Sequence, residues 1–168
     1  MKSIVMLATV HEYQVLGNGR NSELGKRLDY LIHKFGARIV MEEWSEKRGE
    51  SYAKAFAGEK AFATKSAFVW ASVGTPDEPQ YCTYRGRINH PEYNGTLPDP
   101  EWIAPEMDEY GPFENQETRE NRMAMNVQAE MENYESGLFI LGLAHLHSVF
   151  GKLQSLEFKV TAFSWLAT

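Results

Sequence analysis

Two histidines follow apolar segments of the kind that form buried strands of a parallel sheet. Segment 4–9 leads into His11, and segment 137–143 leads into His145. Such strands are continuous and apolar because both of their faces are covered. In open α/β sheets, ligands bind just past the carboxyl ends of the strands. We therefore expect both imidazoles at one edge of a sheet, and we expect the functional site at that edge.

Two further residues could act with these histidines. Glu42 follows a third apolar segment at 38–41, and Arg119 lies in a segment with helical periodicity. A histidine beside a carboxylate can act as a general base, and the same donor atoms can bind a divalent metal. An arginine can stabilise a developing oxyanion. We predict His11, Glu42, His145 and Arg119 as catalytic residues, with His11 as the general base. If a metal takes part, its predicted ligands are His11, Glu42 and His145.

Residues close to this cluster are predicted to contact the substrate. Because side chains alternate along a strand, only one of Glu42 and Glu43 can point into the site, and either could position His11. Asn126 shares a helix face with Arg119 by its spacing. The predicted substrate-binding residues are Glu12, Glu43, Asn126, Trp102 and Tyr110.

The chain offers no marked protein nucleophile. Cys82, the single cysteine, has no nearby basic residues that would favour a thiolate, and no serine lies in a nucleophile elbow. The site should therefore activate water. This predicts a small hydrolase that cleaves an ester or a peptide-type bond in a small-molecule or peptide substrate. The alternative for each single histidine is a hydrogen-bonded structural role.

The elements that must position these residues alternate between strand and helix. Strands are predicted at 4–9, 38–41, 137–143 and 159–165, and helices at 21–35, 50–64, 116–134 and 149–156. Segment 67–73 is either a strand or a continued buried helix. A strand–helix–strand order predicts parallel pairing through a right-handed crossover. We expect one α/β domain that spans residues 1–168.

Segment 74–115 differs in composition from the rest of the chain. It contains all seven prolines, interleaved with tyrosines and Trp102. Long segments without secondary structure in compact domains are lids, binding loops or disordered regions. The many aromatic side chains argue against disorder. We predict an insertion that is either an irregular cap packed on the domain or a lid over the substrate.

Composition limits the partners of the chain. The net charge of −6 argues against nonspecific binding to nucleic acid, which needs clustered Lys and Arg. No apolar run is long enough to span a membrane. A single cysteine excludes an internal disulfide and suits a reducing compartment. We expect a cytoplasmic protein without a nucleic-acid or membrane partner, and a homo-oligomer is left open.

Four short motifs resemble those of known protein families, and they follow one another along the chain in the order expected of those families. Ala-Thr-Val-His at 8–11 resembles the Gly-Thr-x-His motif of the TraB/PrgY/GumN and TIKI group, and 142–146 resembles its Gly-x-x-His element. Segment 119–126 resembles the Arg-Asp-x-x-Met-Ala-x-Asn helix of erythromycin-esterase-like and ChaN-like proteins. Glu42 stands where both groups carry a glutamate. Together the motifs resemble the wider EreA/ChaN–TraB superfamily, of which the chain would be a minimal, short member.

The resemblance implies a mixed, mostly parallel sheet flanked by helices, with a polar site at the strand ends. It implies ester hydrolysis or metal-dependent peptide cleavage in some branches, for which Mn²⁺ or Zn²⁺ would serve, and haem binding in the ChaN branch. A hydrolase is our first interpretation. The alternatives are a binding protein of the same fold that holds a small ligand, metal or haem, and an interaction or immunity protein that lacks the chemistry.

Overall fold

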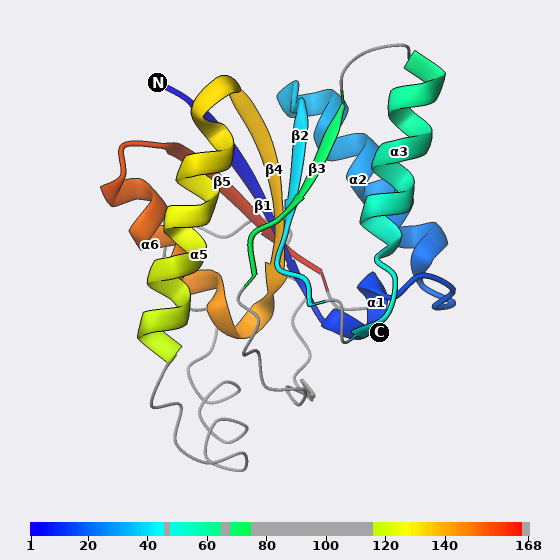
Figure 1. Ribbon diagram of the computed structural model, residues 1–168, viewed down its shortest axis with the longest axis horizontal. Helices are drawn as coiled ribbons and strands as arrows, with labels where there is room; N and C mark the ends of the chain where they lie inside the picture. Colours follow the sequence, from blue (N-terminus) through cyan, green and yellow to red (C-terminus); the bar gives the residue numbers. More distant parts are fainter. Residues whose placement is uncertain (46–47, 65–67, 75–115, 166–168) are drawn as a thin grey trace.

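A five-stranded sheet forms the centre of the molecule (Figure 1). The computed structural model describes residues 1–45, 48–64, 68–74 and 116–165. The strands lie in the order β3-β2-β4-β1-β5, and their bounds are β1 Ser3–Thr9, β2 Ile39–Glu42, β3 Val69–Ser72, β4 Ser136–Gly142 and β5 Lys159–Ser164. The predicted α/β class is confirmed. Every pair in this sheet is parallel, whereas a mixed sheet was expected.

The two central strands end at the same level. β1 and β4 pair over their whole lengths, from Ser3 beside Ser136 to Thr9 beside Gly142. Both strands are almost entirely buried and apolar, as expected of strands that are covered on both faces. The chain segments that follow Thr9 and Gly142 therefore leave the sheet side by side, at the carboxyl ends of the strands. His11 and His145 lie in these two segments.

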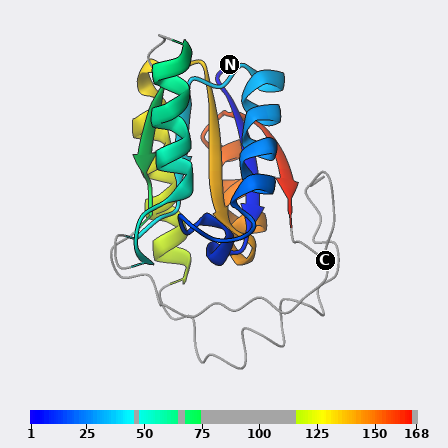
Figure 2. The same ribbon diagram turned by 90° about the vertical axis from the view of Figure 1, so that its right-hand side faces the viewer.

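Helices cover the two faces of the sheet in two layers (Figures 1 and 2). One layer contains α2 (Asn21–Phe35) and α3 (Tyr52–Thr64), and the other contains α5 (Gln116–Glu130) and α6 (Leu146–Ser155). Alternate strand residues pack against opposite layers, because side chains alternate along a strand. This alternation separates the core into two clusters and also decides where the polar residues at the strand ends point.

Most element boundaries agree with the sequence prediction. Helix α2 ends as predicted at Gly36, whose φ of 65° is the left-handed conformation that glycine adopts freely. The ambiguous segment at 67–73 contains strand β3. The predicted helix at 116–134 is divided, because η2 (Met131–Asn133) continues from α5 as a 3₁₀-helix.

The region around His145 departs from the predicted boundaries. Strand β4 ends at Gly142, the 3₁₀-helix η3 (Leu143–His145) follows, and α6 begins three residues before the predicted start at 149. His145 is therefore the last residue of a short helical turn rather than part of an extended strand. The predicted insertion, with Trp102 and Tyr110, lies outside the described residues except for Gly74. Among the described helices, none combines the length and apolarity needed to cross a bilayer.

Candidate functional site

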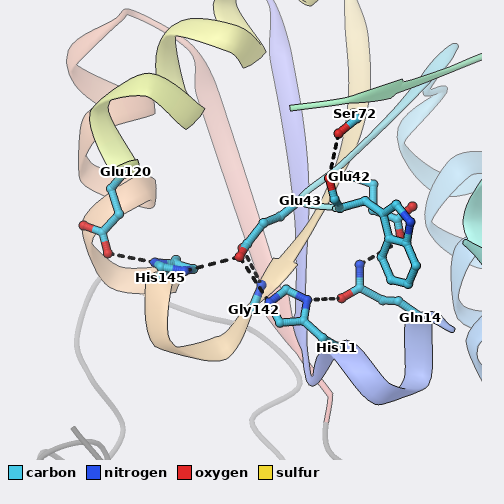
Figure 3. A network of polar contacts seen from close by, with 9 residues as sticks. His11, Gln14, Glu42, Glu43, Ser72, Glu120, Gly142 and His145 are labelled. Carbon is cyan, nitrogen blue, oxygen red and sulfur yellow. Dashed lines mark hydrogen bonds and ion pairs between the residues drawn. The ribbon is translucent and has the colours of Figure 1, made fainter. Parts of the chain in front are cut away.

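Three polar side chains from three different elements meet at the carboxyl edge of the sheet (Figure 3). His11 begins α1 (His11–Gln14), Glu43 follows β2, and His145 ends η3. The Oε1 atom of Glu43 lies 3.1 Å from Nε2 of His11 and 3.3 Å from Nε2 of His145. Their relative exposures are 6% for His11, 1% for Glu43 and 4% for His145, so the cluster is buried.

The opposite end of each of these side chains is held by a hydrogen bond. Nδ1 of His11 lies 2.8 Å from Oε1 of Gln14, and Nδ1 of His145 lies 2.9 Å from Oε1 of Glu120. Oε2 of Glu43 accepts the backbone N–H of Gly142 at 3.0 Å. The two Nε2 atoms and Oε1 of Glu43 are consequently the atoms that face one another. Among the described residues, Oε1 has no hydrogen-bond partner, although both imidazoles lie at ion-pair distance.

Gly142 is needed for this close approach. A Cβ atom at this position would lie 3.0 Å from Nε2 of His11 and 3.6 Å from Oε2 of Glu43. A larger residue would therefore press on the imidazole of His11, whereas its contact with Glu43 would be an ordinary van der Waals contact. The glycine in the sequence motif therefore has a packing reason within this site.

Charge determines the protonation of Glu43 and His145. Burial alone would raise the pKa of Glu43, but the charges of His145 and His11 lower it well below its usual value. Burial alone would lower the pKa of His145, but Glu43 and Glu120 raise it to about 10. At neutral pH, Glu43 is therefore a carboxylate and His145 is an imidazolium cation with a carboxylate at each ring nitrogen.

Glu42 points away from this cluster. Its Oε2 accepts Nε2–H of Gln14 at 2.7 Å, and its Oε1 accepts the hydroxyl of Ser51 and the indole N–H of Trp70, the latter at 2.9 Å. Burial raises the pKa of Glu42, and these hydrogen bonds together with the charge of His11 offset part of that rise. The amide of Gln14 connects Glu42 to His11 by hydrogen bonds.

The predicted cluster is assembled with Glu43 where Glu42 was expected. Val40 packs in the core cluster under α2 and α3, whereas Met41 packs in the cluster under α5 and α6. Alternation then directs Glu42 to the first layer and Glu43 to the second, which carries His145. His11 and His145 do lie together, as expected from parallel strands that end in register.

The long helix contributes Glu120 to the site. Glu120 is buried and bonds His145, whereas its neighbour Arg119, the predicted oxyanion stabiliser, is partly buried. Asn126, predicted to bind substrate, donates instead to the backbone carbonyl of Val73 at 3.2 Å. Glu12, also predicted to bind substrate, is exposed at the surface of α1.

Sequence reasoning missed four residues of the two networks. Glu120 lies three residues before Met123 on the buried stripe of α5, and this spacing could have identified it. The other three gave no comparable signal, because each is brought in by a loop or by a different element: Gln14, Ser51 and Trp70.

The predicted metal ligands are not brought together as a set. The oxygens of Glu42 are directed to Gln14, Ser51 and Trp70, so a metal ion beside the two histidines would have to use Glu43. Within the described ranges, no group of three or more His, Cys, Asp and Glu side chains is arranged to hold a metal ion. Mn²⁺, Zn²⁺ and haem stay predictions.

Comparisons with protein-family models, with curated proteins and with solved structures found no match to this chain. The resemblance to the EreA/ChaN–TraB superfamily stays a prediction. Function is therefore inferred from the chemistry of the site.

Proposed function

We propose that the protein is a hydrolase in which His11 and Glu43 activate a water molecule at the carboxyl edge of the sheet. The observation that supports this most is Glu43, a fully buried carboxylate between two imidazoles whose Oε1 lacks a hydrogen-bond partner among the described residues. Buried ion pairs add little to stability compared with apolar packing, because both charges must be desolvated. A buried carboxylate that is shared by two imidazoles suits catalysis better than it suits packing.

The three side chains take different roles. Nε2 of His11 accepts a proton from water, since histidine is the side chain that exchanges protons near neutral pH with little tuning. Glu43, 3.1 Å from Nε2, balances the positive charge of the protonated His11. His145 is a cation between Glu43 and Glu120, and its charge keeps Glu43 ionised beside His11.

The reaction is a direct attack by water. The oxygen of water forms a bond to the carbonyl carbon of an ester or peptide-type substrate, and His11 takes the proton. His11 then gives this proton to the leaving alcohol or amine as the carbon–heteroatom bond breaks. No covalent enzyme intermediate forms.

The test is turnover of a panel of ester and peptide substrates by the wild-type chain and by His11→Ala. Removal of a general base typically costs about 10²- to 10⁴-fold in rate, so His11→Ala should lose turnover by at least that lower factor. His33→Ala is a matched control, because His33 is exposed on α2. Its turnover should equal that of the wild type.

The same assay addresses the predicted metal. Turnover that is lost on chelation and restored by Mn²⁺ or Zn²⁺ would show that a metal acts at this edge, where it would polarise the carbonyl or the water. Turnover that is unaffected by a chelator would support the metal-free pair of His11 and Glu43. A wild-type chain that cleaves no member of the panel would refute the proposed hydrolase and favour a binding protein.

A further inference from the structure

Behind His11 lies a second buried network that the proposed reaction does not use. The amide of Gln14 joins its two ends: Oε1 lies 2.8 Å from Nδ1 of His11, and Nε2 donates to Oε2 of Glu42 at 2.7 Å. Both Gln14 and Glu42 have a relative exposure of 0%. We infer that Glu42 is a positioning residue that acts through Gln14 to fix the tautomer of His11. The inference rests on the proposed function in one respect, because that function takes Nε2 of His11 as the nitrogen that accepts a proton from water.

The first step is the orientation of the Gln14 amide. The indole N–H of Trp70 can only donate, and the hydroxyl of Ser51 accepts the backbone N–H of Lys54 at 3.2 Å, so its own proton points to Glu42. Both therefore donate to Oε1 of Glu42. Oε2 of Glu42 is also an acceptor, and the NH₂ group of Gln14 donates to it at 2.7 Å. The reverse orientation would place two acceptor oxygens against each other.

The second step is the tautomer of His11. With the NH₂ group of Gln14 committed to Glu42, its Oε1 faces Nδ1 of His11 and can only accept. Nδ1 must then carry a proton. Nε2 lies 3.1 Å from Oε1 of Glu43 and is therefore the nitrogen at which His11 gains or loses its second proton.

The backbone holds this network in place. Val15 and Ser51 form an isolated antiparallel bridge, and the N–H of Leu16 donates to the carbonyl of Glu50 at 2.8 Å. The end of α1 is thereby tied to the start of α3. Gln14 and Ser51, one residue from each tied segment, reach Glu42 from two sides without freedom to move apart.

The experiment measures the tautomer directly. Ring ¹⁵N–¹H correlations by NMR, on the full chain labelled at histidine, report which nitrogen of His11 carries the proton, and comparison with His11→Asn assigns the signals. At a pH at which the ring is neutral, the wild-type His11 should carry its proton on Nδ1. Glu42→Gln should give a mixture of tautomers, because an amide at position 42 can present either a donor or an acceptor to Gln14. Glu50→Gln removes an exposed carboxylate nearby and should leave the signals unchanged.

A second variant keeps the inference testable if Glu42→Gln does not fold. Gln14→Met preserves the length of the side chain but removes both hydrogen bonds, and it should also release the tautomer. Groups that orient metal-bound histidines contribute about 10- to 100-fold, and we expect kcat to fall by a factor of that size with little change in KM. Wild-type-like ring signals in the folded variants would refute the inference.

The two proposals can fail separately. A tautomer that changes in Glu42→Gln, in a chain that hydrolyses nothing, would support the positioning role and refute the proposed hydrolase. Hydrolysis by the wild-type chain, with a tautomer that does not respond to Glu42→Gln or Gln14→Met, would refute the positioning role alone.

Discussion

Glu42 and Glu43 are neighbours in the sequence and are equally buried, yet their surroundings change their pKa values in opposite directions. Glu42 is surrounded by neutral donors from Gln14, Ser51 and Trp70, and its pKa is raised by burial. Glu43 lies between two imidazoles, and its pKa is well below the usual value. The comparison shows that the charge of the partners, more than burial or the number of hydrogen bonds, keeps a buried carboxylate ionised.

The difference begins with the alternation of side chains on either side of one peptide bond. Glu42 contacts neutral groups of Gln14 in α1, Ser51 just before α3 and Trp70 in β3. Glu43 contacts His11 at the start of α1 and His145 of η3, which Glu120 of α5 holds. Paired groups whose pKa values are pushed apart are typical of acid–base sites. Two adjacent residues therefore take different roles. Glu43 contacts Nε2 of His11, where the proposed reaction takes place, and Glu42 positions His11 through Gln14.

The largest effect is expected for Glu43→Gln. The amide keeps the shape of the side chain but leaves the buried His145 cation without one of its two carboxylates. Breaking a buried ion pair by removal of one partner costs about 3–5 kcal/mol in the free energy of unfolding. Urea denaturation measures this loss, and Glu117→Gln, at an exposed position of α5, is the control. A loss equal to that of the control would show that the charge of Glu43 does not matter.

The sequence predicts much of the fold and the meeting of the two histidines, but it does not predict which of the two glutamates lies between them. Apolar runs and Gly36 define the strands and the end of α2, because burial and backbone conformation are local requirements. The meeting of His11 and His145 follows from the parallel pairing of β1 with β4.

The choice between Glu42 and Glu43 could not be predicted. All four residues of β2 are buried, so the strand has no polar alternation that reveals which side faces which layer. Gln14 could not be found either, because the four-residue helix α1 is too short to show periodicity. Its role depends on contacts with Glu42, which is 28 positions away in the sequence.

The second prediction concerns pH. The folded-state pKa of His145, about 10, exceeds its usual value of 6.5, so the stabilisation is fully present below about pH 6.5 and is lost as the pH rises through about 10. The pKa of Glu43 is lowered from 4.5, so its contribution is present above about pH 4.5 and is lost as the pH falls through the lowered value. Both contributions to stability are therefore complete between about pH 4.5 and pH 6.5.

Urea midpoints across this pH range measure the effect, and stability should decline on the alkaline side as His145 loses its proton. In Glu43→Gln the alkaline decline should be smaller, because the variant retains only Glu120 as a carboxylate partner of His145. An alkaline decline of the same size in the wild type and in Glu43→Gln would contradict the assigned ion pair.

The smallest effect on stability is expected for Glu42→Gln. Because burial raises the pKa of Glu42, ionisation of this group opposes folding above about pH 4.5, so its sign is opposite to that of Glu43. An amide at this position removes the buried charge and can still accept from Ser51 and Trp70 through its oxygen. The loss in the free energy of unfolding at neutral pH should therefore stay within about 1 kcal/mol, the scale of one hydrogen bond. Urea denaturation of Glu42→Gln beside Glu43→Gln makes the comparison, and equal losses in the two variants would show that the neutral and the charged surroundings do not differ as described.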